Sequence, residues 1–181
     1  MNKFKSLLLS LLVVATSSLR ADNLSFNNSN SSINFEINHM LFMTAKGSFK
    51  EFSGNIDITD STLVSATISF SVKVASIDTD DDERDEHLRT KDYFDVAKYP
   101  DANFKSTQIE SIGENKYKVN GDLTIHGSTK SVVFVMTEKK LESMKAEYHM
   151  ELELNRLDFG VGESSLMMGD NVKLKVILTD K

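Results

Sequence analysis

Apolar and polar side chains alternate along several long stretches of this chain, and this period of two constrains the fold more than any other feature. Successive side chains of a β-strand point to opposite faces, so each stretch has one apolar and one wetted face. Antiparallel sheets show this pattern, whereas buried parallel strands are apolar on both faces. The clearest examples are residues 33–39, 66–74, 117–125, 145–154 and 172–178.

These stretches predict a mainly β protein in which one antiparallel sheet closes into a tall barrel. Several run to about nine or ten residues, longer than the typical five or six of strands in globular proteins. Short polar segments join them, and long two-faced strands favour a barrel over a flat sandwich. We therefore expect about eight strands. Alternation alone leaves open whether side chains fill the interior or leave room for a ligand.

One segment departs from this pattern and predicts a short helix at about residues 81–89. Asp80, with Glu83 three residues later, fits an N-cap with its reciprocal partner, and the intervening acidic residues suit the positive end of a helix dipole. Pro100, the only proline, excludes helix beyond it. Large apolar side chains occur in this otherwise charged region. We expect three of them to be buried against the barrel: Leu88, Phe94 and Phe104.

Residues 1–21 have the features of a secretory signal peptide. Lys3 and Lys5 precede an apolar run at 7–15, and small residues follow it. The run is too short to cross a hydrocarbon core of about 30 Å, which needs about 20 apolar residues. Cleavage after Ala21 leaves residues 22–181 as one domain, which we expect to be exported.

Composition excludes several classes of function. The chain has no cysteine, so disulfides, thiolate metal sites and a cysteine nucleophile are excluded. Its net charge is −6, and removing the three basic residues of the leader makes this about −9. An acidic chain without a basic stripe is not expected to bind nucleic acid or anionic membrane surfaces.

Motifs that carry chemistry are few. The four histidines lack metal-ligand spacing, although His39 has inward phase and is placed to meet a ligand head group. Asp78-x-Asp80-x-Asp82 imitates the start of a calcium loop, but Glu83 stands where glycine is needed. The chain has no serine hydrolase motif, phosphate-binding glycine loop or dinucleotide fingerprint. We therefore expect no metal, no cofactor and no catalysis.

Five groups of motifs, in order along the chain, resemble the YceI-like family. The most specific group spans the predicted helix and reads Arg84-Asp85-x-His87-Leu88, Asp92-Tyr93-Phe94-Asp95 and Tyr99-Pro100-x-x-x-Phe104. The other groups are Phe35-x-Ile37-x-His39 with Gly47-x-Phe49-x-x-Phe52-x-Gly54, Ser76-Ile77-Asp78-Thr79, Gly121-x-Leu123-Thr124-Ile125-His126-Gly127-x-Thr129-Lys130, and Arg156-x-Asp158-Phe159-Gly160 with Gly169-Asp170-x-Val172.

The resemblance implies a periplasmic, lipocalin-like barrel that carries a polyisoprenoid, quinone-like or other long-chain amphiphile and catalyses no reaction. At about −0.3 kcal/mol per heavy atom, a chain of roughly forty carbons reaches about −12 kcal/mol, which is nanomolar binding. The residues of inward phase are then the expected ligand-binding residues: Phe35, Ile37, His39, Phe70, Val72, Val119, Leu123, Met150, Leu152 and Leu174.

Two other functions remain open on the sequence. The same cavity could position a lipid for isomerisation or hydrolysis by His39 or by Arg84 with His87, or the barrel could be solidly packed and serve as an interaction module. For Arg84 and Asp85, we favour anchoring of the helix by charge-assisted hydrogen bonds.

Three further segments carry expectations. The run 132–136 is apolar on both faces, so its outer face should be covered by the helix or by a second copy, and the resemblance makes a homodimer reasonable. Residues 139–144 lack the glycine-rich turn expected of the family, and residues 166–168 are unusually apolar. Either departure would alter ligand choice if it borders the mouth of the cavity.

Overall fold

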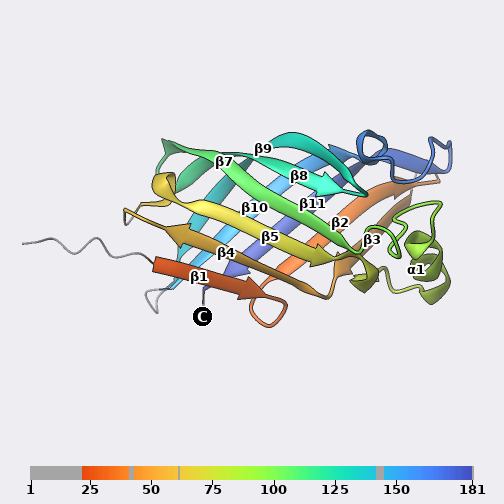
Figure 1. The fold of residues 1–181 in the computed structure, drawn as a ribbon, viewed down its shortest axis with the longest axis horizontal. Helices are drawn as coiled ribbons and strands as arrows, with labels where there is room; N and C mark the ends of the chain where they lie inside the picture. The colour runs from red at the N-terminus through yellow and green to blue at the C-terminus, as the bar shows by residue number, and fades with distance from the viewer. Residues whose placement is uncertain (1–21, 41–42, 61, 142–144, 181) are drawn as a thin grey trace, which may run out of the picture.

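The computed structural model describes residues 22–40, 43–60, 62–141 and 145–180. They form one antiparallel sheet that curls into a barrel-like shell, with a short helix at one end of the long axis (Figure 1). The strands are β1 (Asp22–Asn27), β2 (Ser32–His39), β3 (Met43–Phe49), β4 (Phe52–Ile58), β5 (Thr67–Lys73), β6 (Ile77–Asp78), β7 (Asp101–Gly113), β8 (Lys116–Ile125), β9 (Ser128–Lys140), β10 (Ala146–Asn155) and β11 (Met168–Thr179). The helix is α1 (Asp82–Arg89).

The predicted fold class is confirmed, but the predicted number of strands was too low. The sheet contains eleven strands in the order β1-β4-β5-β7-β8-β9-β10-β11-β2-β3-β6. β1 and β6 are short additions at the two ends of this order. Residues 43–58 bend at Lys50 and Glu51, so that they form two strands at opposite sides of the order instead of one.

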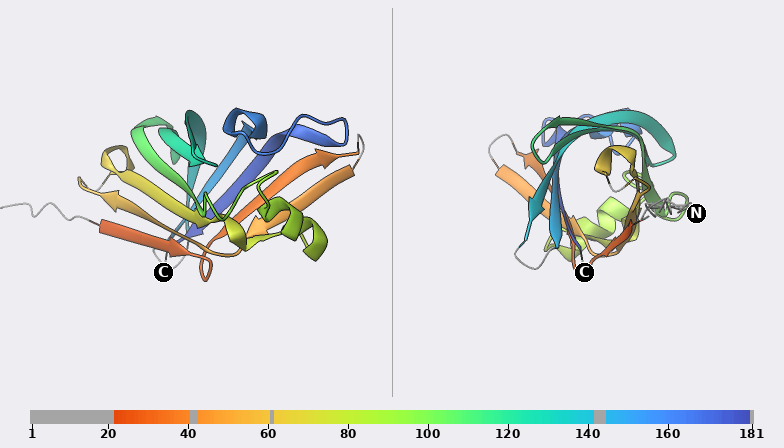
Figure 2. Two further views of the ribbon diagram at one scale, coloured as in Figure 1. Left: turned by 45° about the vertical axis from the view of Figure 1, so that its right-hand side comes forward. Right: turned by 90° about the vertical axis from the view of Figure 1, so that its left-hand side faces the viewer.

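Side chains alternate between the two faces as the sequence predicted. On β10, Tyr148 and Met150 are buried inside the shell, while Glu151 and Glu153 are exposed to solvent. Every long neighbouring pair in the sheet is antiparallel. The end-on view in Figure 2 shows the strands surrounding a common interior.

α1 begins one residue later than the sequence indicated. Asp81, not Asp80, is the N-cap: its side chain accepts a hydrogen bond from the backbone N–H of Arg84 at 3.0 Å. Asp80 adopts a left-handed backbone with φ of 59°, and its N–H donates to the Asp78 carboxylate at 3.0 Å. Asp80 therefore belongs to the turn that precedes the helix.

The half of the interior farther from α1 is solidly packed. Its buried cluster contains Phe26, Ile56, Leu63, Ile68, Ile109, Val119, Phe134, Met136, Tyr148, Met150 and Leu178. The rings of Phe26 and Tyr148 meet edge to face, with 6.1 Å between their centroids. Burial raises the pKa of the Tyr148 hydroxyl, as expected for an ionisable group surrounded by apolar side chains.

The two-sided apolar run on β9 is not covered by the helix. Phe134 and Met136 point into the core, whereas Val133 is 57% exposed and Val135 is 45% exposed on the outer face. β9 and α1 lie on different sides of the molecule in both ribbon views (Figures 1 and 2). The helix, one of the two covers predicted for this run, therefore does not cover it.

Among the residues that the structure describes, no helix has the length and apolar character needed to cross a bilayer.

Candidate functional site

An apolar cavity of about 220 Å³ occupies the half of the interior nearer to α1. Its walls come from the inner faces of β2, β3, β5, β7, β8, β10 and β11 and from the segments that cover this end of the shell. Nearly all of the surface that faces the cavity is carbon, which makes it suited to an apolar ligand.

Six of the ten predicted ligand-binding residues line this cavity: Phe35, Ile37, His39, Val72, Leu123 and Leu174. The other four lie in the packed half. Val119 and Met150 are members of the buried cluster, and Phe70 and Leu152 pack against it. All ten point inward, but the phase of a strand gives the face on which a residue lies and not its depth along the barrel.

The cover of the cavity holds residues that sequence reasoning did not assign to the site. They come from the stretch between β6 and the end of α1, from the loop after α1, and from the segment between β10 and β11: Thr79, Arg84, Leu88, Tyr93, Phe94, Arg156, Phe159 and Val161. Seven of them, all but Val161, belong to the motifs quoted above, and Arg84, Leu88 and Phe94 were already assigned roles in holding the helix. The motifs were therefore a signal for the cover, although their chemistry pointed to anchoring or, for Arg84 with His87, to catalysis.

Leu88 and Phe94 contact the barrel but are only half-buried, and so is Phe104. The expectation that these three side chains are buried against the barrel is therefore confirmed only in part. Leu88 and Phe94 face the cavity instead of a packed core, and the Phe94 ring meets the Phe49 ring edge to face with centroids 6.4 Å apart. Phe104 lies on β7, one inward position deeper than the cavity-lining Ala102.

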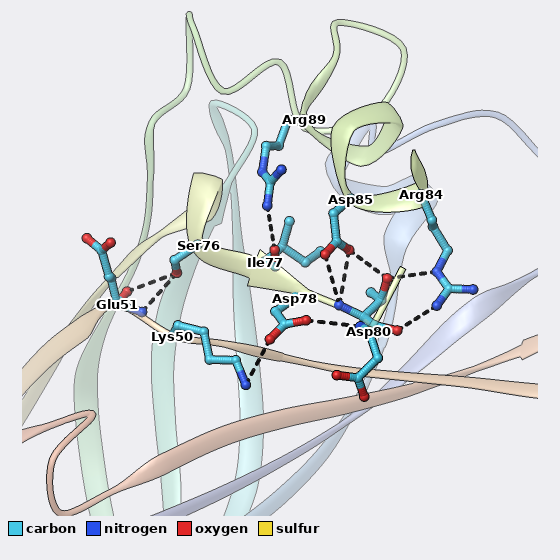
Figure 3. A network of polar contacts seen from close by, with 10 residues as sticks. Lys50, Glu51, Ser76, Ile77, Asp78, Asp80, Arg84, Asp85 and Arg89 are labelled. Atoms are coloured by element: carbon cyan, nitrogen blue, oxygen red, sulfur yellow. Dashed lines mark hydrogen bonds and ion pairs between the residues drawn. The ribbon is translucent and has the colours of Figure 1, made fainter. Parts of the chain in front are cut away.

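Asp85 and Arg84 attach α1 to the chain that precedes it. The buried Asp85 carboxylate accepts hydrogen bonds from the Thr79 backbone N–H at 3.0 Å and from the Thr79 hydroxyl at 2.6 Å (Figure 3). Arg84 donates from Nε to the Thr79 hydroxyl at 2.8 Å and from Nη2 to the Thr79 carbonyl at 2.6 Å. These contacts give both side chains the anchoring role that the sequence favoured.

Charged side chains also hold the turn before the helix in place. Asp78 accepts from the Asp80 N–H and forms an ion pair with Lys50 at 3.0 Å (Figure 3). First that N–H and then the Lys50 ammonium hold the pKa of Asp78 below its usual value. Arg89 donates to the carbonyls of Ala75 and Ile77, both at 2.8 Å. The calcium-like acidic triplet therefore belongs to the start of the helix and to its attachment.

Arg156 fixes the opposite part of the cover. Its buried guanidinium donates to three carbonyls, those of Gly169 at 3.0 Å, Val161 at 2.8 Å and Glu163 at 2.8 Å. It also pairs with the Asp170 carboxylate at 3.2 Å. One side chain thus sets the path of the loop that connects β10 to β11.

Gly162 is the point where the two parts of the cover meet. It has a left-handed φ of +68°, and a Cβ there would lie 2.8 Å from the Tyr93 ring and 2.9 Å from the Arg156 guanidinium. Only glycine combines this backbone with such a close approach. The loop after α1 and the loop before β11 therefore pack closely at this end of the barrel.

Polar groups are concentrated at the outer end of the cavity. The polar residues of its lining lie at the end of β2 or in the cover, while the deeper lining, such as Ile33 and Leu174, is apolar; these polar residues are His39, Thr79, Arg84, Tyr93 and Arg156. The donors of Arg84 and Arg156 are engaged within the cover, so the cavity itself presents a surface suited to an apolar chain.

Arg84 and His87, the pair considered for catalysis, are not brought together in the cavity. His87 is exposed and meets the Tyr93 ring edge to face, with ring centroids 5.0 Å apart, and it does not line the cavity. Arg84 is engaged with Thr79. Within the described residues, no three His, Cys, Asp or Glu side chains are grouped so that they would hold a metal ion.

Only one of the two departures from the family pattern lies beside the cavity. Met168 lines it, and the adjacent Leu166 and Met167 are 90% and 53% exposed. The other departure begins with Lys139 and Lys140, the last residues of β9, at the opposite end of the barrel, and residues 142–144 lie outside the described residues.

The fold and cavity define a class: barrel-like β proteins with an apolar internal cavity covered by one short helix. Within it, the chain belongs to the YceI-like domain family, whose pattern matches residues 24–179. A UPF0312 protein of Photorhabdus laumondii is 40% identical over 124 residues, which are 68% of this chain and 64% of that protein. A UPF0312 protein of Pseudomonas savastanoi is 36% identical over 134 residues, covering 71% and 70%.

Solved structures show the same fold. BcnA of Burkholderia cenocepacia superimposes with a TM-score of 0.80 at 26% identity, over 86% of this chain and 99% of that one. A polyisoprenoid binding domain from Saccharophagus degradans gives a TM-score of 0.70 over 88% and 98%, and at 15% identity this likeness is one of fold alone.

Proposed function

We propose that this protein is an exported binding protein that holds a long-chain isoprenoid, quinone-like or other amphiphilic lipid in the α1-end cavity and catalyses no reaction. The observation that carries the proposal is the almost entirely apolar wall of a cavity that is covered at its α1 end. The polyisoprenoid binding domain of the same fold supports it.

A matched pair of variants on β11 tests the proposal. Leu174 faces the cavity, whereas its neighbour Lys173 is exposed on the outer face. Leu174→Asp places a charge in an apolar cavity and should abolish saturable binding of fatty and isoprenoid alcohols, because burying an unpaired carboxylate is strongly unfavourable. Lys173→Asp should bind as the wild type does. Thermal melts of both variants must accompany the assay, since Leu174→Asp also weakens folding.

No saturable binding of any such alcohol by well-folded wild type would contradict the proposal. Val119 and Leu152 would be poorer positions for the charge, because Val119 lies in the packed half and Leu152 packs against it.

Export and association are parts of the same proposal. Residues 1–21, which carry the signal-peptide pattern, lie outside the described residues. Cell fractionation should place a form lacking about 21 residues in the periplasm. For association, we propose a homodimer through the outer face of β9, where Val133 and Val135 are exposed. An unprocessed form retained in the cytoplasm would contradict the first part.

A further inference from the structure

The interior of this barrel is divided across its axis by a layer of side chains. Four half-buried residues make up this layer, which we call the floor: Phe70, Phe104, Leu152 and Val176. Each packs against the buried cluster, and none lines the cavity. One inward position nearer to α1, the corresponding residues line the cavity: Val72, Ala102, Leu154 and Leu174.

The two rings of the floor are held in place from several sides. Phe70 and Phe104 are direct partners in the β5–β7 ladder. Glycines of the flanking strands lie beneath them: a Cβ at Gly54 would be 2.1 Å from the Phe70 ring, and a Cβ at Gly121 would be 2.4 Å from the Phe104 ring. Phe104 also contacts Phe134 of the buried cluster, with ring centroids 5.4 Å apart.

The depth of the cavity above the floor limits the length of the ligand chain that fits inside. On β2, the lining runs from Ile33 to His39, which at ~3.3 Å per residue is about 20 Å along the strand. With a tilt of ~40°, typical of barrel strands, the depth along the axis is about 15 Å. An extended carbon chain with bonds of ~1.5 Å advances about 1.3 Å per carbon, so about twelve extended carbons reach the floor.

We infer that the floor sets the length of chain that this protein accepts, and that its ligand is an amphiphile with an apolar chain of about twelve to fifteen carbons. The inference rests on the proposed function and narrows its ligand class. A chain of about forty carbons, which the sequence led us to consider, would leave most of its length outside the barrel. The cavity volume of about 220 Å³, below the ~300–1,000 Å³ usual for small-molecule pockets, favours the shorter chain.

A length series of straight-chain alcohols and isoprenoid alcohols, from about eight to about forty carbons, tests this inference by displacement of an environment-sensitive dye. Each buried methylene should strengthen binding about fourfold until the chain reaches the floor, and further carbons should add little. The dissociation constant should therefore fall steeply with length and level off near twelve to fifteen carbons.

Two variants should move this break in opposite directions. Ala102→Leu fills space above the floor and should shift the break two or three carbons shorter. Phe104→Ala removes a floor ring and should shift it longer, with Phe104→Leu as the milder form if the alanine variant is unfolded. Ile109→Ala is the matched control, because Ile109 lies on the same strand in the packed half and should leave the break unchanged.

The possible outcomes distinguish failure of the length limit from failure of the proposed function. Saturable binding whose strength keeps rising to about forty carbons, or a break that Ala102→Leu leaves in place, would overturn the length limit and leave the proposed function intact. Absence of saturable binding at every length by folded wild type would overturn both.

Discussion

At the scale of single residues, the cover of the cavity depends on two buried charged side chains. Asp85 joins α1 to Thr79, and Arg156 holds the loop between β10 and β11. Each charge is paired with several donors or acceptors, which is the condition under which a buried ionic group is tolerated. Both residues belong to the motifs that carried the family resemblance, which explains why those motifs were the most informative part of the sequence.

Arg156→Lys should lower the free energy of unfolding by about 2–4 kcal/mol. A lysine ammonium cannot reproduce the planar fork that reaches three carbonyls and a carboxylate, so buried acceptors are left unpaired. Denaturant titration measures the change, with the exposed Lys173→Arg as the control. A loss below about 0.5 kcal/mol would mean that the loop keeps its path without this side chain.

Asp85→Asn should cost about 1–3 kcal/mol, because an amide has one acceptor oxygen where the carboxylate has two. The amide NH₂ would face donors of Thr79, from which the carboxylate now accepts. Glu86→Gln, at the exposed neighbouring position, should change stability by less than about 0.5 kcal/mol. Equal effects of the two substitutions would contradict the anchoring role of Asp85.

At the scale of secondary structure, the sequence predicted the long strands. It predicted the attachment of the helix only in part. Alternation identified the long strands because one face of each is packed and the other wetted. The start of α1 was misplaced by one residue because Asp80 and Asp81 are chemically equal candidates for the N-cap, and the left-handed backbone of Asp80 decides between them. β1 and β6 were missed because they are short and carry no long alternating run.

Phe94→Ala should cost about 1–3 kcal/mol, less than the ~3–5 kcal/mol of truncating a fully buried phenylalanine. The ring is half-buried and borders the cavity, so its removal enlarges an existing space instead of opening a new one. Thermal and denaturant unfolding should agree on this range. A loss of about 4 kcal/mol or more would indicate that the ring is as tightly packed as those of the buried cluster.

At the scale of the whole molecule, the sequence predicted an inward face but not how the interior is shared between core and cavity. Val119 and Leu123 have the same phase on the same strand, yet Val119 lies in the packed half and Leu123 lines the cavity. What separates them is the set of rings that other strands bring to each level, such as Phe104 and Phe134. That depth depends on strand tilt and register, which no single segment encodes.

The outer face of β9 belongs to this scale as well. Val133→Lys should convert the proposed homodimer to a monomer in light scattering, because a charged side chain would replace an exposed apolar one at the interface. Lys130→Ala, on an exposed position of the same strand, serves as the control. A wild type that remains monomeric at every concentration would remove the dimer from the account.

The central claim is that the covered, apolar end of the barrel holds a water-insoluble chain. It is tested most directly by denaturing organic extraction and mass spectrometry of the purified, processed protein. The account predicts an amphiphile in near-stoichiometric amount from the wild type and from Lys173→Asp, and none from folded Leu174→Asp. Well-folded wild type that repeatedly yields no lipid, or equal lipid from Leu174→Asp, would contradict the claim, and a solidly packed interaction module would then be the better description.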